Sequence, residues 1–374
     1  MSELRRTVLH ELHRGHGARF GPFAGWDMPI RYGPGPMAEH LQCRHDAALF
    51  DVSHMTVVDL SGDNVVEAME RLVPADLQAL QVGRLKYTFF TNDAGGIRDD
   101  VMITRRGPNE LRVVLNADGT EEDIEYLRAE LPDNCEVRPR RDLALVALQG
   151  PESERVLARH APAVRDLLFL QEATVSLFGE PVALSRSGYT GGEGFELALP
   201  AEQAAAMVAA LLAEPEVEPA GLAARDSLRL EAGLCLYGHD LDPTTSPVEA
   251  ALLWAIPAAR RHADAGYKGA AAVAAHVTHG APRRRVGLRP IGRRPVREGA
   301  ALHLGDQPVG RVTSGGYSPV LGGPIAMGYL DTSALDSLSA AAGALTAQLG
   351  DRSEPVEVTP LPFVPKTYRR PPRS

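Results

Sequence analysis

Cysteine is scarce in this sequence. The 374 residues include three cysteines, Cys43, Cys135 and Cys235, which lie far apart along the chain. No Cys-x-x-Cys pattern occurs, and an odd number of cysteines argues against a disulfide framework. A reducing compartment fits this usage, so we expect a cytoplasmic protein.

Basic excess and long apolar runs are also missing. Asp and Glu number 48 against 39 Lys and Arg, and the net charge of −9 argues against a dedicated nucleic-acid-binding protein. The longest apolar run, 250–259, is interrupted by Pro257 and is too short to cross a bilayer. The first residues lack the apolar core of a signal peptide. We therefore expect neither nucleic acid nor a membrane as a partner.

Recognisable cofactor patterns are absent as well. There is no Gly-x-Gly-x-x-Gly and no Walker A motif, so nothing supports a bound nucleotide. His40, His45 and His54 lie close in sequence, but their spacing is irregular and no carboxylate or cysteine completes a usual ligand set. We expect His54 to cap or to form core hydrogen bonds, and we expect no metal.

The pattern of elements predicts an α+β protein. The length favours two or three domains. Strand-like and helix-like stretches alternate irregularly up to residue 280, which does not suit a doubly wound sheet. Gly25 and Pro29 punctuate 23–32, so we expect a turn there. From Arg283 onward, short strands separated by Gly and Pro turns predict a small β-barrel or jelly-roll-like module.

Two carboxylates stand next to each other in the predicted strand 97–104. Adjacent strand residues point to opposite faces, so Asp99 and Asp100 cannot both enter one pocket. This argues against a two-carboxylate dyad. One carboxylate can be functional while the other is solvated or caps a neighbour, and it is equally open that both are merely polar strand residues.

Two further stretches have a structural and a functional interpretation. In the predicted helix after Gly221, Arg225 and Arg229 are four residues apart and share a face. They can pair with acids on a surface helix or bind a ligand. The glycine-rich stretch 187–197 is either a plain hairpin loop or a loop whose backbone approaches a ligand.

Seven arginines lie between Arg283 and Arg297. A solvated basic face explains them most simply. The alternative is an electrostatic attraction for an acidic partner or for a polyglutamate tail.

Several motifs together resemble the aminomethyltransferase family, the T-proteins of the glycine cleavage system. They occur in the family's order and span the chain from the Trp26 region to Tyr368. They are Phe50-Asp-Val-Ser-His-Met55, Gly95-Gly-Ile-Arg-Asp-Asp-Val101, Ala147-Leu-Gln-Gly-Pro151, the loop from Gly188 to Glu196, the Ala-Arg-Asp block at Arg225, 312–319 and 362–368.

The resemblance implies an arrangement and a reaction. It implies two mixed antiparallel-sheet and helix domains and a C-terminal β-barrel or jelly-roll-like domain around a central folate-binding opening. The domains would comprise residues 1–50 with 140–250, residues 51–139 with 251–280, and residues 283–374. The implied reaction moves an aminomethyl group from the lipoyl arm of H-protein to tetrahydrofolate, giving 5,10-methylenetetrahydrofolate and ammonia.

The same resemblance assigns site residues. It makes Asp99 the catalytic carboxylate beside the reacting folate nitrogen. Glu196 and Arg225 would bind the polar edge of the pterin. The remaining folate-binding candidates are Met55, Tyr87, Asn116, Tyr189 and Tyr368.

Two departures from the family pattern keep other functions open. Gly192 stands where the family usually has glutamate, and Arg98 stands where an aliphatic residue is usual. One alternative is a folate-dependent paralogue with a different one-carbon donor or acceptor. Another is a folate-binding protein without catalysis.

Overall fold

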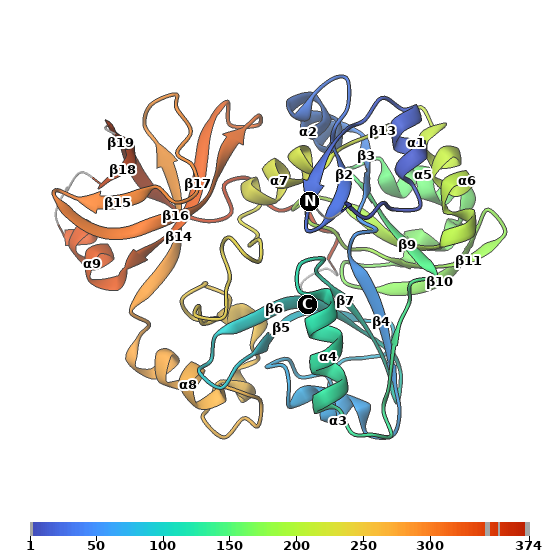
Figure 1. Cartoon of the computed structure of the whole chain (residues 1–374), viewed down its shortest axis with the longest axis horizontal. Coiled ribbons are helices and arrows are strands. Elements are labelled where there is room, and N and C mark those ends of the chain that lie inside the picture. The colour runs from blue at the N-terminus through green and yellow to red at the C-terminus, as the bar shows by residue number, and fades with distance from the viewer. Residues whose placement is uncertain (1–2, 341–344, 351, 371–374) are drawn as a thin grey trace.

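Three lobes, each built on its own sheet, surround the centre of the molecule (Figure 1). The computed structural model describes residues 3–340, 345–350 and 352–370. Two lobes mix helices with sheets and the third is a closed barrel of six strands. The predicted α+β class and the C-terminal barrel are therefore confirmed. The residue boundaries of the three domains stay a prediction.

The first lobe contains a six-stranded sheet in the order β10-β11-β12-β9-β3-β13. Its strands are β3 (Ala47–Asp51), β9 (Leu143–Gln149), β10 (Glu172–Leu177), β11 (Glu180–Ser185), β12 (Gly194–Pro200) and β13 (Val217–Pro219). Its helices are α1 (His10–Gly15), α2 (Pro36–His45), α5 (Ser153–His160), α6 (Ala201–Leu212) and α7 (Leu222–Glu231), with a 3-10 turn at Pro162–Asp166.

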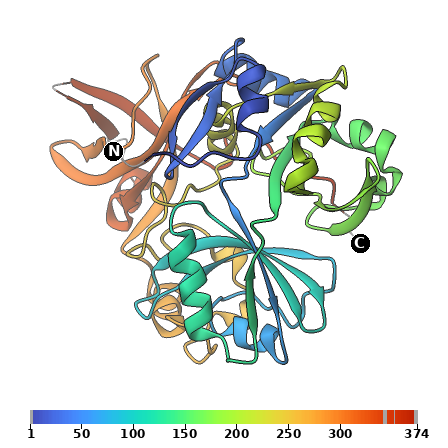
Figure 2. The same ribbon diagram turned by 45° about the vertical axis from the view of Figure 1, so that its right-hand side comes forward.

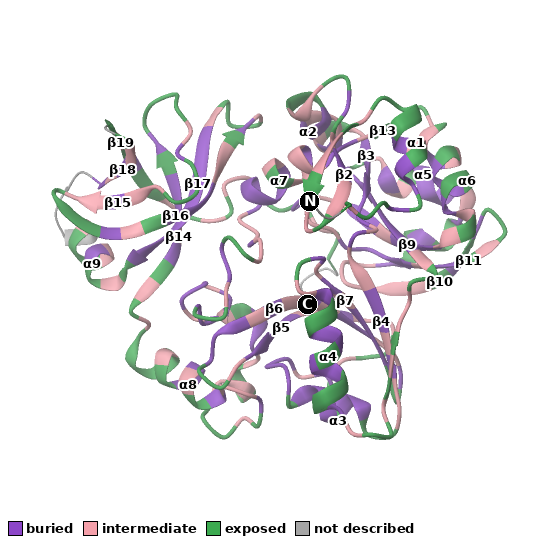
Figure 3. Cartoon of the chain, in the orientation of Figure 1, coloured by how far each residue is buried: buried purple, intermediate pink, exposed green. Residues whose placement is uncertain are grey.

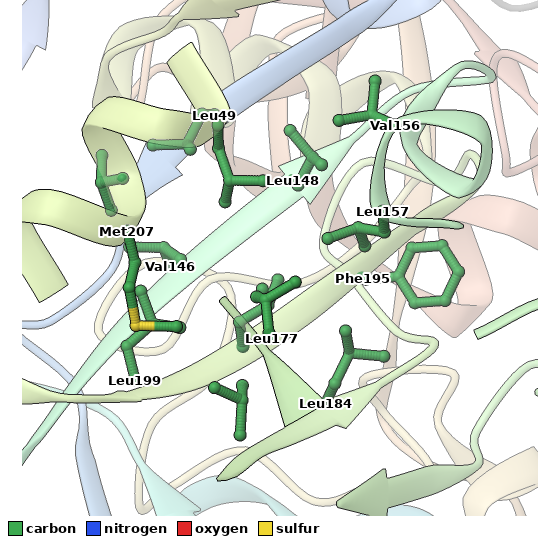
Figure 4. Packing of buried hydrophobic residues seen from close by; sticks show 14 of the residues in the cluster. Leu49, Val146, Leu148, Val156, Leu157, Leu177, Leu184, Phe195, Leu199 and Met207 are labelled. Atoms are coloured by element: carbon green, nitrogen blue, oxygen red, sulfur yellow. The ribbon is translucent and has the colours of Figure 1, made fainter. Parts of the chain in front are cut away.

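Both faces of this sheet are covered, which explains why β3 and β9 consist almost entirely of apolar residues. On one face Leu49, Val146 and Leu148 pack with α5 and α6 (Figure 4). On the other face Phe50 and Ala147 pack with residues of α7. The burial of these strands is visible as purple ribbon in Figure 3.

The second lobe contains a five-stranded sheet in the order β5-β6-β7-β4-β8. The strands are β4 (Thr56–Ser61), β5 (Leu85–Thr91), β6 (Ile97–Gly107), β7 (Glu110–Leu115) and β8 (Glu136–Pro139). Helices α3 (Val65–Glu70) and α4 (Thr120–Glu130) cover one face, and the teal α4 crosses the sheet in Figure 2. Short 3-10 turns at Leu253–Ala255 and Ala258–Arg260 lead to α8 (Ala270–His279), which packs beside β5 and β6.

The barrel closes in the order β14-β17-β16-β15-β18-β19. Its strands are β14 (Arg283–Pro290), β15 (Ala301–Leu304), β16 (Gln307–Ser318), β17 (Gly323–Asp331), β18 (Leu345–Leu349) and β19 (Arg352–Thr359), and α9 (Thr332–Ala340) follows β17. No helix in the described part of the chain is long and apolar enough to span a membrane.

The turn expected across residues 23–32 is wrong. Strand β2 (Trp26–Arg31) pairs with β1 (Arg19–Phe23) as a separate two-stranded sheet. Gly25, with φ of 77°, makes the tight turn. Pro29 is compatible with β2 because it pairs with Phe20 of β1, while the bridge from Arg5 on the other edge lies at Trp26, so the missing N–H can face an unpaired position.

Candidate active site

A cavity of about 1190 Å³ lies between the three lobes and takes lining residues from each of them. Seven of the eight residues predicted from the sequence line it: Met55, Tyr87, Asn116, Tyr189, Glu196, Arg225 and Tyr368. They come from segments more than 300 positions apart in the chain, and folding brings them together. The eighth predicted residue, Asp99, does not line this cavity.

One part of the cavity wall carries a charged pair with unused hydrogen-bonding capacity. Arg225 on α7 places its guanidinium carbon 4.8 Å from the centre of the Tyr189 ring. Its buried Nη1 has no hydrogen-bond partner among the described residues. Glu196 on β12 accepts a hydrogen bond of 2.5 Å from Ser187 and attracts the guanidinium electrostatically. A buried donor without a partner, next to a carboxylate, suits a ligand with a polar edge.

A second part of the wall holds a carboxylate between two donors. Tyr87 donates to Asp100 Oδ2 at 2.8 Å, and the amide of Asn116 donates to Asp100 Oδ1 at 3.0 Å. Burial is the main cause that raises the pKa of Asp100 to about 7; a negative charge on Asp99 would act in the same direction, and both hydrogen bonds oppose the rise. A carboxyl group with this pKa can accept and return a proton near neutral pH.

Asp99 points to the opposite face of β6. Asp99 shares its face of β6 with Val101, which packs in the core beneath α4, whereas an irregularity in the β5–β6 pairing puts Ile97 in the core on the other face. Asp100 therefore lines the cavity at the place where the family resemblance implied Asp99. The catalytic role expected of Asp99 stays a prediction, but its side chain does not line the cavity, because the two faces of a strand are separated by the sheet itself.

Two aromatic stacks complete the wall, and each contains a residue that the sequence analysis did not single out as a ligand contact. Tyr87 stacks on Trp254, with ring centres 5.5 Å apart. Tyr368 stacks on Phe169 at 3.8 Å and with an interplanar angle of 8°. The sequence offered one signal for Trp254 and Phe169: both are aromatic residues in irregular segments, and aromatic residues make up only 5% of the chain.

Tyr368 belongs to a C-terminal segment, residues 360–370, that runs from the barrel back to the first lobe. The amide of Phe363 donates to the Glu231 carbonyl at 2.9 Å, and that of Thr367 donates to the Gly191 carbonyl at 3.0 Å. The amide of Phe169 in turn donates to the Arg369 carbonyl at 2.9 Å. These bonds fix the segment, and with it the Tyr368 ring, across the first lobe.

The two departures from the family pattern lie outside the cavity lining. A Cβ built on Gly192 meets Thr367 Oγ1 at 3.6 Å, so the site has room for a side chain. Glu193 beside it binds Arg186 through its carboxylate at 2.8 Å. Arg98 places its guanidinium 4.4 Å from the centre of the Tyr126 ring. Neither Gly192 nor Arg98 is therefore a residue that lines the cavity.

The arginine cluster divides in two. Arg284 and Arg285 line the cavity, and Arg283 pairs with Glu249 at 2.9 Å. The others point to solvent, as a basic face predicts; they are Arg289, Arg293, Arg294 and Arg297.

The histidines near the N-terminus have structural surroundings. His40 binds Ser227 at 2.7 Å and Glu231 at 3.0 Å. His54 packs edge-on against Phe23 at the cavity, and burial lowers its pKa to about 4. Within residues 3–340, 345–350 and 352–370, no group of three or more His, Cys, Asp or Glu is arranged to hold a metal ion.

Comparison with known proteins agrees with this architecture over the whole chain. Residues 9–260 match the GCVT N-terminal domain, and residues 283–365 match the glycine cleavage T-protein C-terminal barrel domain. The mitochondrial aminomethyltransferase of Gallus gallus is 42% identical, over 98% of this chain and 94% of the relative. The aminomethyltransferase of Thermosynechococcus vestitus is 39% identical, over 98% and 96%.

A solved structure gives the same result in three dimensions. The crystal structure of glycine cleavage system aminomethyltransferase T from Bartonella henselae superimposes with a TM-score of 0.91 at 39% identity. It covers 98% of this chain and 100% of that chain. The chain therefore belongs to the T-protein family of glycine cleavage system aminomethyltransferases.

Proposed function

We propose that the cavity binds tetrahydrofolate and that the protein transfers to it the aminomethyl group carried on the lipoyl arm of H-protein. The products are 5,10-methylenetetrahydrofolate, ammonia and the reduced lipoyl thiol. The observation that carries this proposal is the pairing, in one cavity, of the polar Arg225–Glu196 edge with the Asp100 carboxylate. Full-length similarity to aminomethyltransferases supports it.

The Arg225–Glu196 edge is proposed to hold the pterin ring. A pterin presents donors and acceptors side by side, and Arg225 Nη1 and Glu196 offer the complementary set. A ligand that matches them removes the cost of a buried unpaired donor. The Tyr189 ring, already in contact with the Arg225 guanidinium, provides a flat apolar surface next to this edge.

Asp100 is proposed to handle the protons of the transfer. The transferred carbon loses its bonds to sulfur and to the amino nitrogen and gains bonds to two folate nitrogens. The two N–H protons released by folate must reach the departing sulfur and ammonia. Asp100 can accept such a proton as the carboxylate and return it as the acid, because its pKa is about 7.

Tyr87 and Asn116 are proposed to orient that carboxylate. Each donates to a different oxygen of Asp100, so the carboxylate plane is fixed. The stack of Tyr87 on Trp254, and that of Tyr368 on Phe169, would exclude water from the reacting atoms. Met55 adds a further apolar contact.

The proposed partner is the lipoylated H-protein, and the proposed compartment is the cytoplasm. In the described part of the chain the three cysteines are unpaired, in keeping with a reducing environment. H-protein dependence also distinguishes this function from that of a paralogue acting on another one-carbon donor.

The reverse reaction tests the proposal directly. The protein is mixed with methylenetetrahydrofolate, ammonia and reduced lipoyl H-protein, and aminomethylated H-protein is sought by mass spectrometry. We expect product that depends on Asp100. Folate binding without product would point to the paralogue, and absence of both would overturn the proposed function.

A further inference from the structure

A smaller hollow of about 280 Å³ lies on the other side of β6 from the folate cavity. Its lining includes Asp99, Asp118, Glu122, Asp123 and Tyr237. Asp118 and Glu122 are exposed, so the hollow is open to solvent, whereas Asp99 and Asp123 are buried. The folate cavity and this hollow have Asp118 and Tyr237 in common.

Asp99 and Asp123 line the same hollow, and the side chain of each affects the pKa of the other. Asp99 Oδ1 already accepts from the Asn116 amide and from the Asp100 backbone N–H, each at 2.8 Å. The Oδ2 atoms of both aspartates are buried and lack a hydrogen-bond partner within the described ranges. Two ionised carboxylates in this arrangement would repel, whereas one proton between them creates a hydrogen bond.

Asn116 connects this pair to the folate cavity. Its side-chain nitrogen donates to Asp99 Oδ1 at 2.8 Å and to Asp100 Oδ1 at 3.0 Å. The two carboxylates therefore lie on opposite faces of β6 but share one donor. A negative charge on Asp99 would act on Asp100 through a short, buried path where solvent screens poorly.

We propose that Asp99 and Asp123 share a single proton near neutral pH, and that Asp123 is thereby a positioning residue that keeps a second negative charge away from Asp100. The inference rests on the proposed function, in which Asp100 carries the protons of the reaction. It gives the first carboxylate of the Asp99-Asp100 motif a role of its own.

The surrounding charges place the proton on Asp99. Burial, and then the facing Asp123, raise the pKa of Asp99. Burial also raises the pKa of Asp123, but the Arg98 guanidinium opposes this rise. Glu122 on α4 and Asp100 on β6 add negative charge, which favours one shared proton over two ionised groups. Tyr237, from the loop after α7, contributes a hydroxyl that stays neutral, because burial raises its pKa.

Two amide variants separate this role from a structural one. Asp99→Asn mimics the neutral acid: its oxygen can accept from Asn116 and its amide can donate to Asp123. We expect it to keep the wild-type pH profile of turnover. Asp123→Asn removes the partner that shares the proton, so Asp99 can ionise. We then expect the acid limb assigned to Asp100 to move up by about 1 to 3 pH units.

Glu125→Gln is the matched control, because Glu125 lies on the same helix but is exposed. It should leave both turnover and profile unchanged. A downward shift in Asp99→Asn would mean that Asp99 is ionised in the wild type, and an unmoved profile in Asp123→Asn would remove its positioning role. Either result overturns the inference.

Infrared spectroscopy tests the proton without using activity. About one pH unit above the Asp100 pKa, the wild type should show a carboxylic-acid carbonyl band that Asp99→Asn lacks. Absence of that band overturns the shared proton, even if Asp123→Asn does not fold. If the band is present but Asp100→Asn retains full turnover, the proposed function fails while the protonated pair stands.

Discussion

Burial raises the proton affinity of Asp100. This affinity suits proton transfer, but it lowers the free energy of unfolding as the pH rises. Its carboxyl group keeps its proton up to a pKa of about 7 in the folded chain, whereas an unfolded aspartate releases it near about 3.9. Between these values the folded state binds more protons, so the free energy of unfolding falls as the pH rises. The proton affinity that suits proton transfer is thus a cost to the fold.

Asp100→Asn should lower turnover by roughly 10² to 10⁴, the range for losing a positioned acid–base group. The variant cannot titrate, so its unfolding midpoint relative to the wild type should rise as the pH increases from about 4 to about 7. Steady-state kinetics and urea titrations at several pH values measure both effects. Near-normal turnover, or a stability difference independent of pH, would contradict this account of Asp100.

Arg225→Ala should weaken folate binding by about 10- to 100-fold, because hydrogen bonds to charged groups are worth roughly 1.5 to 3 kcal/mol. Arg225→Lys keeps the charge but loses the planar fork, so it should recover only part of the affinity. Titration calorimetry with tetrahydrofolate measures the change. If alanine and wild type bind folate equally, Arg225 does not contact the ligand.

The sequence constrained the Asp99-Asp100 pair only in part. Strand geometry correctly implied that only one of the two could enter the cavity. The side chain that enters follows from packing: Val101 belongs to the core under α4, so Asp99 shares that face and Asp100 takes the other. That alternation was present in the sequence. Its meaning required knowing that the cavity lies on the face opposite to α4, which is a property of the tertiary fold.

Helix α7 is the element through which the first lobe holds the barrel. Arg229 on this helix pairs with Asp240 at 2.9 Å and donates to Ser314 of β16 at 2.9 Å. Glu231 at the end of α7 accepts hydrogen bonds from Ser318 of the same strand and from His40 of α2. The helix after Gly221 is therefore an interdomain connection rather than a surface helix, and Arg229 is almost fully buried.

Arg229 pairs with both Asp240 and Asp226. Comparing the two pairs tests how burial changes the contribution of an ion pair to the free energy of unfolding. Asp240 is buried, whereas the side chain of Asp226 is 55% exposed. Asp240→Asn should destabilise the protein by about 3 to 5 kcal/mol, because it removes the charge of the buried carboxylate that pairs with the buried Arg229. Asp226→Asn should cost less than about 1 kcal/mol. Urea unfolding measures both, and equal losses would show that the Arg229–Asp240 pair does not anchor the barrel.

The sequence predicted a strand of the second lobe correctly, and tertiary packing decided an exception elsewhere in the chain. Strand β6 (Ile97–Gly107) contains the predicted strand 97–104 and pairs with β5 and β7. Residues 26–31 were missed because Pro29 is normally excluded from strands. A small two-stranded sheet tolerates proline at positions where the backbone N–H is not needed for pairing. No local pattern in the sequence predicts such a sheet.

At the scale of the whole molecule, the cavity exists only when the three lobes are assembled. Its wall joins Asp100 of the second lobe, Arg225 of the first lobe and Tyr368 of the C-terminal segment. The sequence motifs named Arg225 and Tyr368 but assigned the catalytic role to Asp99 rather than Asp100, and no local pattern gives the distances between these residues. A ligand that contacts all three binds only the assembled state and therefore stabilises the assembly.

Tyr368 tests this dependence on assembly. The residue lies in the segment that returns from the barrel, and its ring stacks on Phe169 of the first lobe at 3.8 Å. Tyr368→Ala removes the stack, which is worth about 0.5 to 1.5 kcal/mol beyond the buried area. We expect weaker folate binding and a smaller rise in melting temperature on adding folate, measured by calorimetry.

Tyr368→Phe is the control, because it keeps the ring and removes only the hydroxyl. If stacking fixes the segment, phenylalanine should retain most of the folate affinity and most of the thermal shift. If phenylalanine behaves like alanine, the hydroxyl contacts the ligand and the stack is secondary. If neither variant changes folate binding, the C-terminal segment is not part of the binding wall, and the cavity must function with two lobes alone.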